Sequence, residues 1–153
     1  MAIREPKSAK ALLNSPLSLY LWTDYNDTLV MKILLTRDSV CAGDDADAPH
    51  SRLLSIDDDC SVAQLLEAIR LEGLPAIAGG HASWVASSAK PLGVLAQQWL
   101  ESRTIWGMSY GTVMSRTKEL DWSDSCLRVH LSYLAQIDPE LVLSVVERLR
   151  LKP

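Results

Sequence analysis

The fold of this chain is decided most clearly by the stretch SVAQLLEAIRLEG, residues 61–73. Ser61 and Gln64 match a capping box, in which the serine hydroxyl accepts the Gln64 amide and the glutamine side chain reaches back. Apolar residues then recur at helical spacing and form one stripe: Val62, Leu65, Leu66 and Ile69, with Leu71 as a further candidate. Gly73 and the following Pro75 stop the pattern. We therefore expect an amphipathic helix that ends near Glu72.

The segments on both sides of this helix have the composition of strands. A β-favouring run over residues 28–36 follows the apolar segment Leu17–Trp22, a pattern that indicates a β-hairpin. Residues 52–56 are expected to form a short strand. Residues 81–86 and 91–99 read as two strands joined by a turn at Ser87–Lys90, which makes a second hairpin. The intervening residues 37–51 contain Gly43, Pro49 and four aspartates, so we expect an exposed loop there.

The C-terminal third predicts a strand and then a helix. Apolar and polar residues alternate from Leu127 to Tyr133, which favours a half-buried strand over the competing helix. Asp138 can cap a final helix that has Pro139 at its first position. Its expected apolar stripe consists of Leu141, Val142, Val145, Val146 and Leu149, and its basic end contains Arg148, Arg150 and Lys152. Residues 100–124 show no hydrophobic periodicity, so we expect loops with short pieces of regular structure there.

These elements indicate one α+β domain that comprises residues 1–153, with residues 1–15 as an N-terminal arm. A chain of 153 residues with 48% hydrophobic and 22% charged residues is typical of a single globular domain. No internal repeat or low-complexity linker divides it. The expected architecture is a mainly antiparallel sheet with a central helix and a C-terminal amphipathic helix.

Composition also limits the compartment and the partners. The longest apolar runs are far shorter than the roughly 20 residues of a membrane span, and Asn14, Ser15 and Pro16 interrupt any secretory signal. The three cysteines form no C-x-x-C pair, which favours reduced thiols and a cytoplasmic protein. The net charge of −4 argues against direct binding to nucleic acid or anionic membranes and would attract a basic partner.

An aspartate-rich stretch is the most distinctive feature of the surface residues. The window from Asp38 to Asp59 contains seven of the nineteen acidic residues and one Arg: the acidic set is Asp38, Asp44, Asp45, Asp47, Asp57, Asp58 and Asp59. Clustered like charges repel one another, so the cluster is a candidate partner-binding site, although a solvated loop is the plainer interpretation. The charges of Asp57–Asp59 are partly explained by the helix that follows, because they precede its positive N-terminal end. Asp44, Asp45 and Asp47, in the loop, have no such local explanation. Trp106, in the irregular region, is a further candidate interface residue.

No motif indicates catalysis, a cofactor or a metal. Asp44, Asp45, Asp47 and His50 lack the ligand spacing of an EF-hand, and there is no phosphate-binding glycine loop. Each of the three histidines fits a surface or structural role, and no nucleophile motif surrounds Cys41 or any serine. We therefore expect a protein that is not an enzyme and has no cofactor. The alternative is a small hydrolase that uses His50 or His81 with a neighbouring aspartate.

Several short segments resemble a known class of proteins. The segments are Met31-Lys32-Ile33-Leu34-Leu35, Ala42-Gly43-Asp44-Asp45, Pro49-His50, Leu74-Pro75-Ala76-Ile77, Gly79-Gly80, Ala82-Ser83-Trp84-Val85, Pro91 and Gln97-Gln98-Trp99. Together they resemble immunity proteins of bacterial contact-dependent growth inhibition and related polymorphic toxin systems. The resemblance extends from about Leu17 to Trp106 and includes no catalytic signature.

This resemblance implies a small acidic cytoplasmic protein that binds and blocks the C-terminal toxin domain of a cognate effector, frequently a nuclease. A nuclease presents a basic surface to nucleic acid, so an aspartate-rich patch can compete for that surface and steer the encounter. The predicted partner is therefore a basic toxin domain, and a homodimer is a further possibility that the sequence leaves open.

Overall fold

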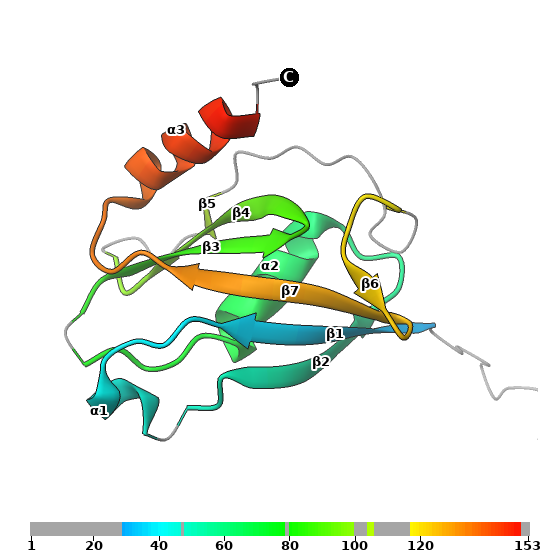
Figure 1. The fold of residues 1–153 in the computed structure, drawn as a ribbon, viewed down its shortest axis with the longest axis horizontal. Coiled ribbons are helices and arrows are strands. Elements are labelled where there is room, and N and C mark those ends of the chain that lie inside the picture. The colour runs from blue at the N-terminus through cyan, green and yellow to red at the C-terminus, as the bar shows by residue number, and fades with distance from the viewer. Residues whose placement is uncertain (1–28, 47, 79, 100–103, 106–116, 151–153) are drawn as a thin grey trace, which may run out of the picture.

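The computed structural model describes residues 29–46, 48–78, 80–99, 104–105 and 117–150, whose arrangement Figure 1 shows. A mixed β-sheet has helix α2 (Val62–Glu72) against one face and helix α3 (Pro139–Arg150) over part of the other. A third helix, α1 (Ala42–Asp45), lies in the loop that follows the first strand. The expected α+β fold with a central and a C-terminal helix is confirmed.

The sheet is antiparallel except at its centre. Its strands are β1 (Val30–Arg37), β2 (Ser51–Asp57), β3 (Ala82–Ser88), β4 (Lys90–Gln97), β5 (Thr104–Ile105), β6 (Trp122–Ser123) and β7 (Cys126–Tyr133). They lie in the order β2-β1-β7-β3-β4-β5, and β6 pairs with β7. Strands β1 and β7 run parallel, whereas every other described pair is antiparallel. The last long strand therefore inserts beside the first.

The partner strand predicted at Leu17–Trp22 lies outside the described part of the chain, so this hairpin stays a prediction. Strand β1 forms at the expected place, but β2 occupies one of its edges and β7 the other. Both hydrogen-bonding edges of β1 are therefore paired from Lys32 to Thr36. Residues 17–22 and the predicted arm at residues 1–15 lie outside the described part of the chain.

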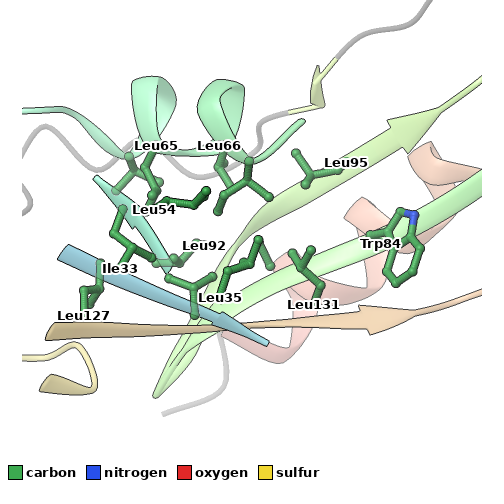
Figure 2. Packing of buried hydrophobic residues seen from close by; sticks show 14 of the residues in the cluster. Ile33, Leu35, Leu54, Leu65, Leu66, Trp84, Leu92, Leu95, Leu127 and Leu131 are labelled. Atoms are coloured by element: carbon green, nitrogen blue, oxygen red, sulfur yellow. The ribbon is translucent and has the colours of Figure 1, made fainter. Parts of the chain in front are cut away.

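Helix α2 forms as the sequence predicts and supplies the centre of the core. The Ser61 hydroxyl accepts the Gln64 amide at 3.2 Å, and the Gln64 side chain accepts the Ser61 amide at 2.8 Å. Leu65 and Leu66 are fully buried against the sheet (Figure 2). Ile69 is fully buried in the same cluster. Leu71 is 67% exposed, because it points away from the sheet, so its assignment to the apolar stripe is wrong.

The predicted second hairpin and the predicted strand near residue 130 are both present. The hairpin of β3 and β4 turns through Ala89, whose φ of 55° is left-handed, so the strands extend into the predicted turn. Strand β7 alternates buried and more exposed residues over Cys126–Tyr133, as its period of two predicts. Within the predicted loop 100–124, the short strands β5 and β6 are the described regular pieces.

Helix α3 begins as predicted, but the face that it buries is narrower than the predicted apolar stripe. The Asp138 carboxylate accepts the Glu140 amide at 2.8 Å, and Val142 and Val146 pack against Val94 of β4. The other members of the predicted stripe, Leu141, Val145 and Leu149, are about half exposed or more. The helix packs chiefly on β4, and this narrow contact covers one side of the helix only. Among the described residues, no helix combines the length and apolar character that crossing a membrane requires.

Candidate functional site

The aspartate-rich stretch is divided between the two ends of strand β2. In the β1–β2 ladder Thr36 lies opposite Ser51, and Val30 lies opposite Asp57. Six residues of strand separate these positions, about 20 Å at 3.3 Å per residue. This distance exceeds the screening length of about 8 Å at physiological salt, so the two groups act as separate charged regions. We call residues 38–50 the loop end and Asp57–Asp59 the turn end.

A buried arginine organises the loop end. Arg37, at the end of β1, has a side chain that is 4% exposed. Its Nε donates to the Pro49 carbonyl at 3.2 Å, and its Nη2 donates to the Ala48 carbonyl at 2.8 Å. Its Nη1 donates to the carbonyl of Asp38 at 2.9 Å and to the Asp45 carboxylate at 2.7 Å. Described residues from both sides of the loop, 38 and 45 on one side and 48 and 49 on the other, are therefore gathered around one guanidinium.

Asp45 has a structural role in this loop. Its carboxylate also accepts the Ser39 hydroxyl and the Val40 amide, the latter at 3.1 Å. The Ser39 hydrogen bond and the Arg37 guanidinium lower the pKa of Asp45 to about 2, against the effect of burial. The prediction that the loop aspartates lack a local structural explanation is therefore wrong for Asp45. Asp44 lies in α1, so the loop is not irregular throughout, and Asp47 lies outside the described residues.

Asp38 is tied to strand β7 across the parallel pair. Its carboxylate accepts the Tyr133 amide at 3.0 Å and lies 3.0 Å from Nε2 of His130. The other ring nitrogen of His130 is 2.9 Å from the Thr36 hydroxyl. A hydroxyl, an imidazole and a carboxylate are thus connected on the open face of the sheet. Sequence reasoning missed this chain, although the alternation of β7 already placed His130 on its polar face.

The negative charge of the turn end is less neutralised than that of the loop end. In the part of the chain that the structure describes, none of the carboxylates of Asp57, Asp58 and Asp59 forms an ion pair. Helix α2 is capped by Ser61, so these side chains are not needed as caps. Burial, and then the three carboxylates, raise the pKa of the neighbouring Cys60 thiol to about 11. This end presents three adjacent negative charges.

A polar cleft of about 190 Å³ adjoins the loop end. It is lined by the end of β1 and by two loops, residues 48–50 and 73–76, together with Arg52. Gln97 helps to fix the second loop, because its Nε2 donates to the Pro75 carbonyl at 2.5 Å. The Gln97 Oε1 accepts the Nε1 of buried Trp84 at 3.0 Å. Residues 49–50 and 74–76, which belong to two of the segments of the family resemblance, both line this cleft.

A second, wider pocket of about 350 Å³ lies on the sheet face opposite α2. It is lined by Leu34, Thr36, Ser87, Ser88, Ala89, Asp121, Arg128, Val129 and His130. The hydroxyl of Thr36 and the imidazole of His130 both border it. This pocket is the place where the connected Thr36, His130 and Asp38 could meet a small molecule.

The residues proposed for a hydrolase are arranged differently from the prediction. His50 Nε2 is 3.7 Å from the Asp45 carboxylate, which is too long for a hydrogen bond. His81 stacks on Trp99 with ring centroids 4.6 Å apart. Among the described residues, His130 is the histidine with a carboxylate at hydrogen-bond distance. Within the described ranges, no three His, Cys, Asp or Glu side chains are grouped to hold a metal, and Trp106 lies outside those ranges.

Comparisons with known proteins give no match for this chain, whether with models of protein families, with characterised proteins or with solved structures.

Proposed function

We propose that this chain is an immunity protein that binds and blocks the basic toxin domain of a cognate bacterial effector, with a nuclease as the expected toxin. In this proposal the chain acts in the cytoplasm by binding, and catalyses no reaction. The observation that carries the proposal is the preorganised, acidic edge of the sheet formed by β2, the loop end and the turn end.

The rigidity of the loop end supports a binding role. Surface loops are usually more mobile than the strands they connect, whereas four hydrogen bonds from buried Arg37 hold this one. A surface that is already ordered loses less conformational entropy when a partner binds. Two of the segments that carry the family resemblance, residues 49–50 and 74–76, border the cleft beside this loop.

The charge distribution supports a basic partner. The chain has a net charge of −4, and three of its carboxylates are adjacent at the turn end, with no ion-pair partner among the described residues. A toxin that acts on nucleic acid must present a positive surface, so opposite charges steer the two proteins together and raise the association rate. Occupying that surface would exclude the toxin's substrate.

Co-purification with the neighbouring gene product tests this proposal. The C-terminal domain of the effector encoded by the adjacent reading frame is expressed with and without this chain. We expect a one-to-one complex, loss of nuclease activity at equimolar ratio, and restored growth of cells that express the domain. A toxin domain from an unrelated effector is the control. No complex and no protection with the cognate domain would reject the proposal.

A second candidate function, a small hydrolase, is favoured by the connection of Thr36, His130 and Asp38 beside the wider pocket. A base oriented by a carboxylate and adjacent to a hydroxyl is the general arrangement of nucleophilic catalysis. A panel of nitrophenyl esters and phosphates tests it, with Thr36→Val against the matched Thr36→Ser, and His130→Ala. Turnover that is kept in Thr36→Ser and lost in the other two variants would support this function. Absence of turnover by the wild-type chain would reject it.

A further inference from the structure

Among the strands that the structure describes, none pairs with the outer edge of β2. β2 is the first strand in the sheet order, and β1 is its partner among the described strands (Figure 1). Open edges are a liability that proteins usually block with proline, a bulge or inward-pointing charges. The sequence of β2, SRLLSID, has no proline, and its register with β1 is regular. Its basic residue, Arg52, donates to the Glu72 carbonyl at the end of α2. The edge therefore retains the form of a template for pairing.

The ladder with β1 identifies which backbone groups face outward. The Arg37 amide donates to the His50 carbonyl at 3.1 Å, and the Asp58 amide donates to the Leu29 carbonyl at 2.9 Å. Antiparallel pairs alternate between bonded and non-bonded positions, so the even-numbered residues of β2 bond to β1. The odd-numbered residues, Ser51, Leu53, Ser55 and Asp57, then direct their amides to the open edge. Leu53, at the middle of this edge, is 59% exposed.

The charges at both ends of the edge favour a basic occupant. An added strand of about six residues would extend roughly 20 Å along β2. One of its ends would lie near the turn end and the other near the loop end. By sequence both ends are acidic: residues 37–52 contain four aspartates against two arginines, and the other end has the three carboxylates of Asp57–Asp59. The two parts of the aspartate-rich stretch, which are too far apart for one patch, are therefore both within reach of one extended segment.

The same charges disfavour a second copy of this chain. Two β2 strands related by a two-fold axis pair antiparallel, so the turn end of each copy would lie beside the loop end of the other. Acidic groups would then face acidic groups, and this repulsion opposes edge-to-edge pairing. The acidic charge at both ends of the edge thus favours pairing with a basic strand of another protein and opposes pairing with a second copy of this chain.

We propose that the toxin domain docks by adding an extended, basic segment to the open edge of β2, with its main chain paired to Leu53 and Ser55. This inference rests on the proposed function and specifies the contact. In strand addition, main-chain hydrogen bonds supply affinity and side chains supply specificity. Here Leu53 contributes an apolar contact, and the flanking carboxylates select basic residues at the two ends of the segment.

Replacement of Ser55 separates main-chain pairing from side-chain contact. Ser55→Pro removes an outward amide and leaves the inward ladder to β1 intact, whereas Ser55→Ala keeps the amide. We expect Ser55→Pro to weaken binding of the cognate toxin domain about 10- to 100-fold and Ser55→Ala to change it by less than about threefold. Circular dichroism and thermal unfolding establish that both variants are folded.

A second pair of variants keeps the test valid if Ser55→Pro does not fold. Leu53→Lys and Leu53→Glu lose the same leucine but add opposite charges to the edge. We expect Leu53→Lys to bind a basic segment more weakly than Leu53→Glu. Hydrogen exchange provides the direct readout: the amides of Leu53 and Ser55 become protected in the complex, while those of Leu54 and Ile56 are protected already in the free chain.

The possible results distinguish this inference from the function on which it rests. If no complex forms with the cognate domain, the proposed function fails and the inference fails with it. If the complex forms but Ser55→Pro binds like Ser55→Ala and the outward amides stay unprotected, strand addition is rejected and toxin binding stands. If Ser55→Pro instead abolishes self-association of the free chain, a second copy occupies the edge, which also rejects the inference.

Discussion

The guanidinium of Arg37 lies 2.7 Å from the carboxylate of Asp45, beneath the loop end. Arg37 follows Met31, Ile33 and Leu35 on the inward face of β1 and ends the buried row. Burying a guanidinium is unfavourable unless a counter-ion and hydrogen-bond acceptors are present, and the loop supplies both. The negative charge of the loop end is therefore partly neutralised by the buried Arg37 guanidinium.

Replacement of Asp45 by asparagine should destabilise the protein, because it leaves buried Arg37 without a counter-ion. The pKa of Asp45 in the fold is lowered from 3.8 to about 2, so its contribution to the free energy of unfolding is fully present above about pH 4. That contribution is lost as the pH falls from about 4 to about 2. Thermal unfolding from pH 7 to pH 2 should therefore show a gap between the wild type and Asp45→Asn that closes in acid.

Asp59→Asn is the matched control for this change, because Asp59 is exposed and forms no ion pair among the described residues. Its melting temperature should stay close to that of the wild type at pH 7. Equal melting temperatures for Asp45→Asn and Asp59→Asn would show that the ion pair does not hold the loop.

Alanine at Gly73 should be costly for a steric reason. A Cβ there would lie 2.5 Å from Cδ2 of Leu35 and 2.9 Å from the Ile69 carbonyl, and this carbonyl belongs to the helix backbone. We expect a loss of about 1–3 kcal/mol in the free energy of unfolding, the usual range for overpacking. Gly43→Ala is the control, because a Cβ at Gly43 would meet nothing within 4 Å. Urea unfolding of the two variants measures the difference, and equal stabilities would contradict the packing described for α2.

Gln97 should couple the sheet to the loop that borders the cleft. Gln97→Leu leaves the Nε1 of Trp84 and the carbonyl of Pro75 without their partner, at a cost of about 1–3 kcal/mol for each buried unsatisfied group. Gln97→Glu keeps an acceptor for Trp84 but places a carboxylate oxygen against the Pro75 carbonyl, which repels it, so this variant should also be less stable than the wild type. Urea unfolding gives the order of the three proteins; a leucine variant as stable as the wild type would exclude the coupling.

The thiols should differ in reactivity. Burial and the adjacent carboxylates raise the pKa of Cys60 to about 11, whereas Cys41 is exposed. The thiolate is the reactive form, so at pH 8 iodoacetamide should label Cys41 about 100-fold faster than Cys60. Mass spectrometry of the peptides measures both rates, with labelling in urea as the control in which the difference disappears. Similar rates in the native protein would contradict the burial of Cys60.

The elements that the sequence predicts correctly are those specified by local chemistry. Helix α2 follows from its capping box and spacing, and β7 follows from its alternation. The pairing of β1 with β7 joins residues more than 90 positions apart, and no local pattern encodes it. The contact of His130 with Asp38 and Thr36 depends on that pairing, so the sequence alone does not reveal it. The role of Asp45 depends on the burial of Arg37. Arg37 continues the alternation of Met31, Ile33 and Leu35 on β1, but this alternation predicts its burial only weakly because arginine is usually exposed.

The most direct test of toxin binding by the acidic edge is the association rate with the cognate toxin domain for two charge-matched variants. Asp57→Lys/Asp58→Lys changes the turn end, and Asp44→Lys/Asp47→Lys changes the loop end without disturbing Asp45. Each double replacement adds four charges, so both variants have a net charge of 0 in place of −4. We predict slower association at low salt for both, with the larger effect at the turn end, and a difference that shrinks as salt rises. Association at the wild-type rate for both variants at low salt would contradict the acidic edge as the binding surface.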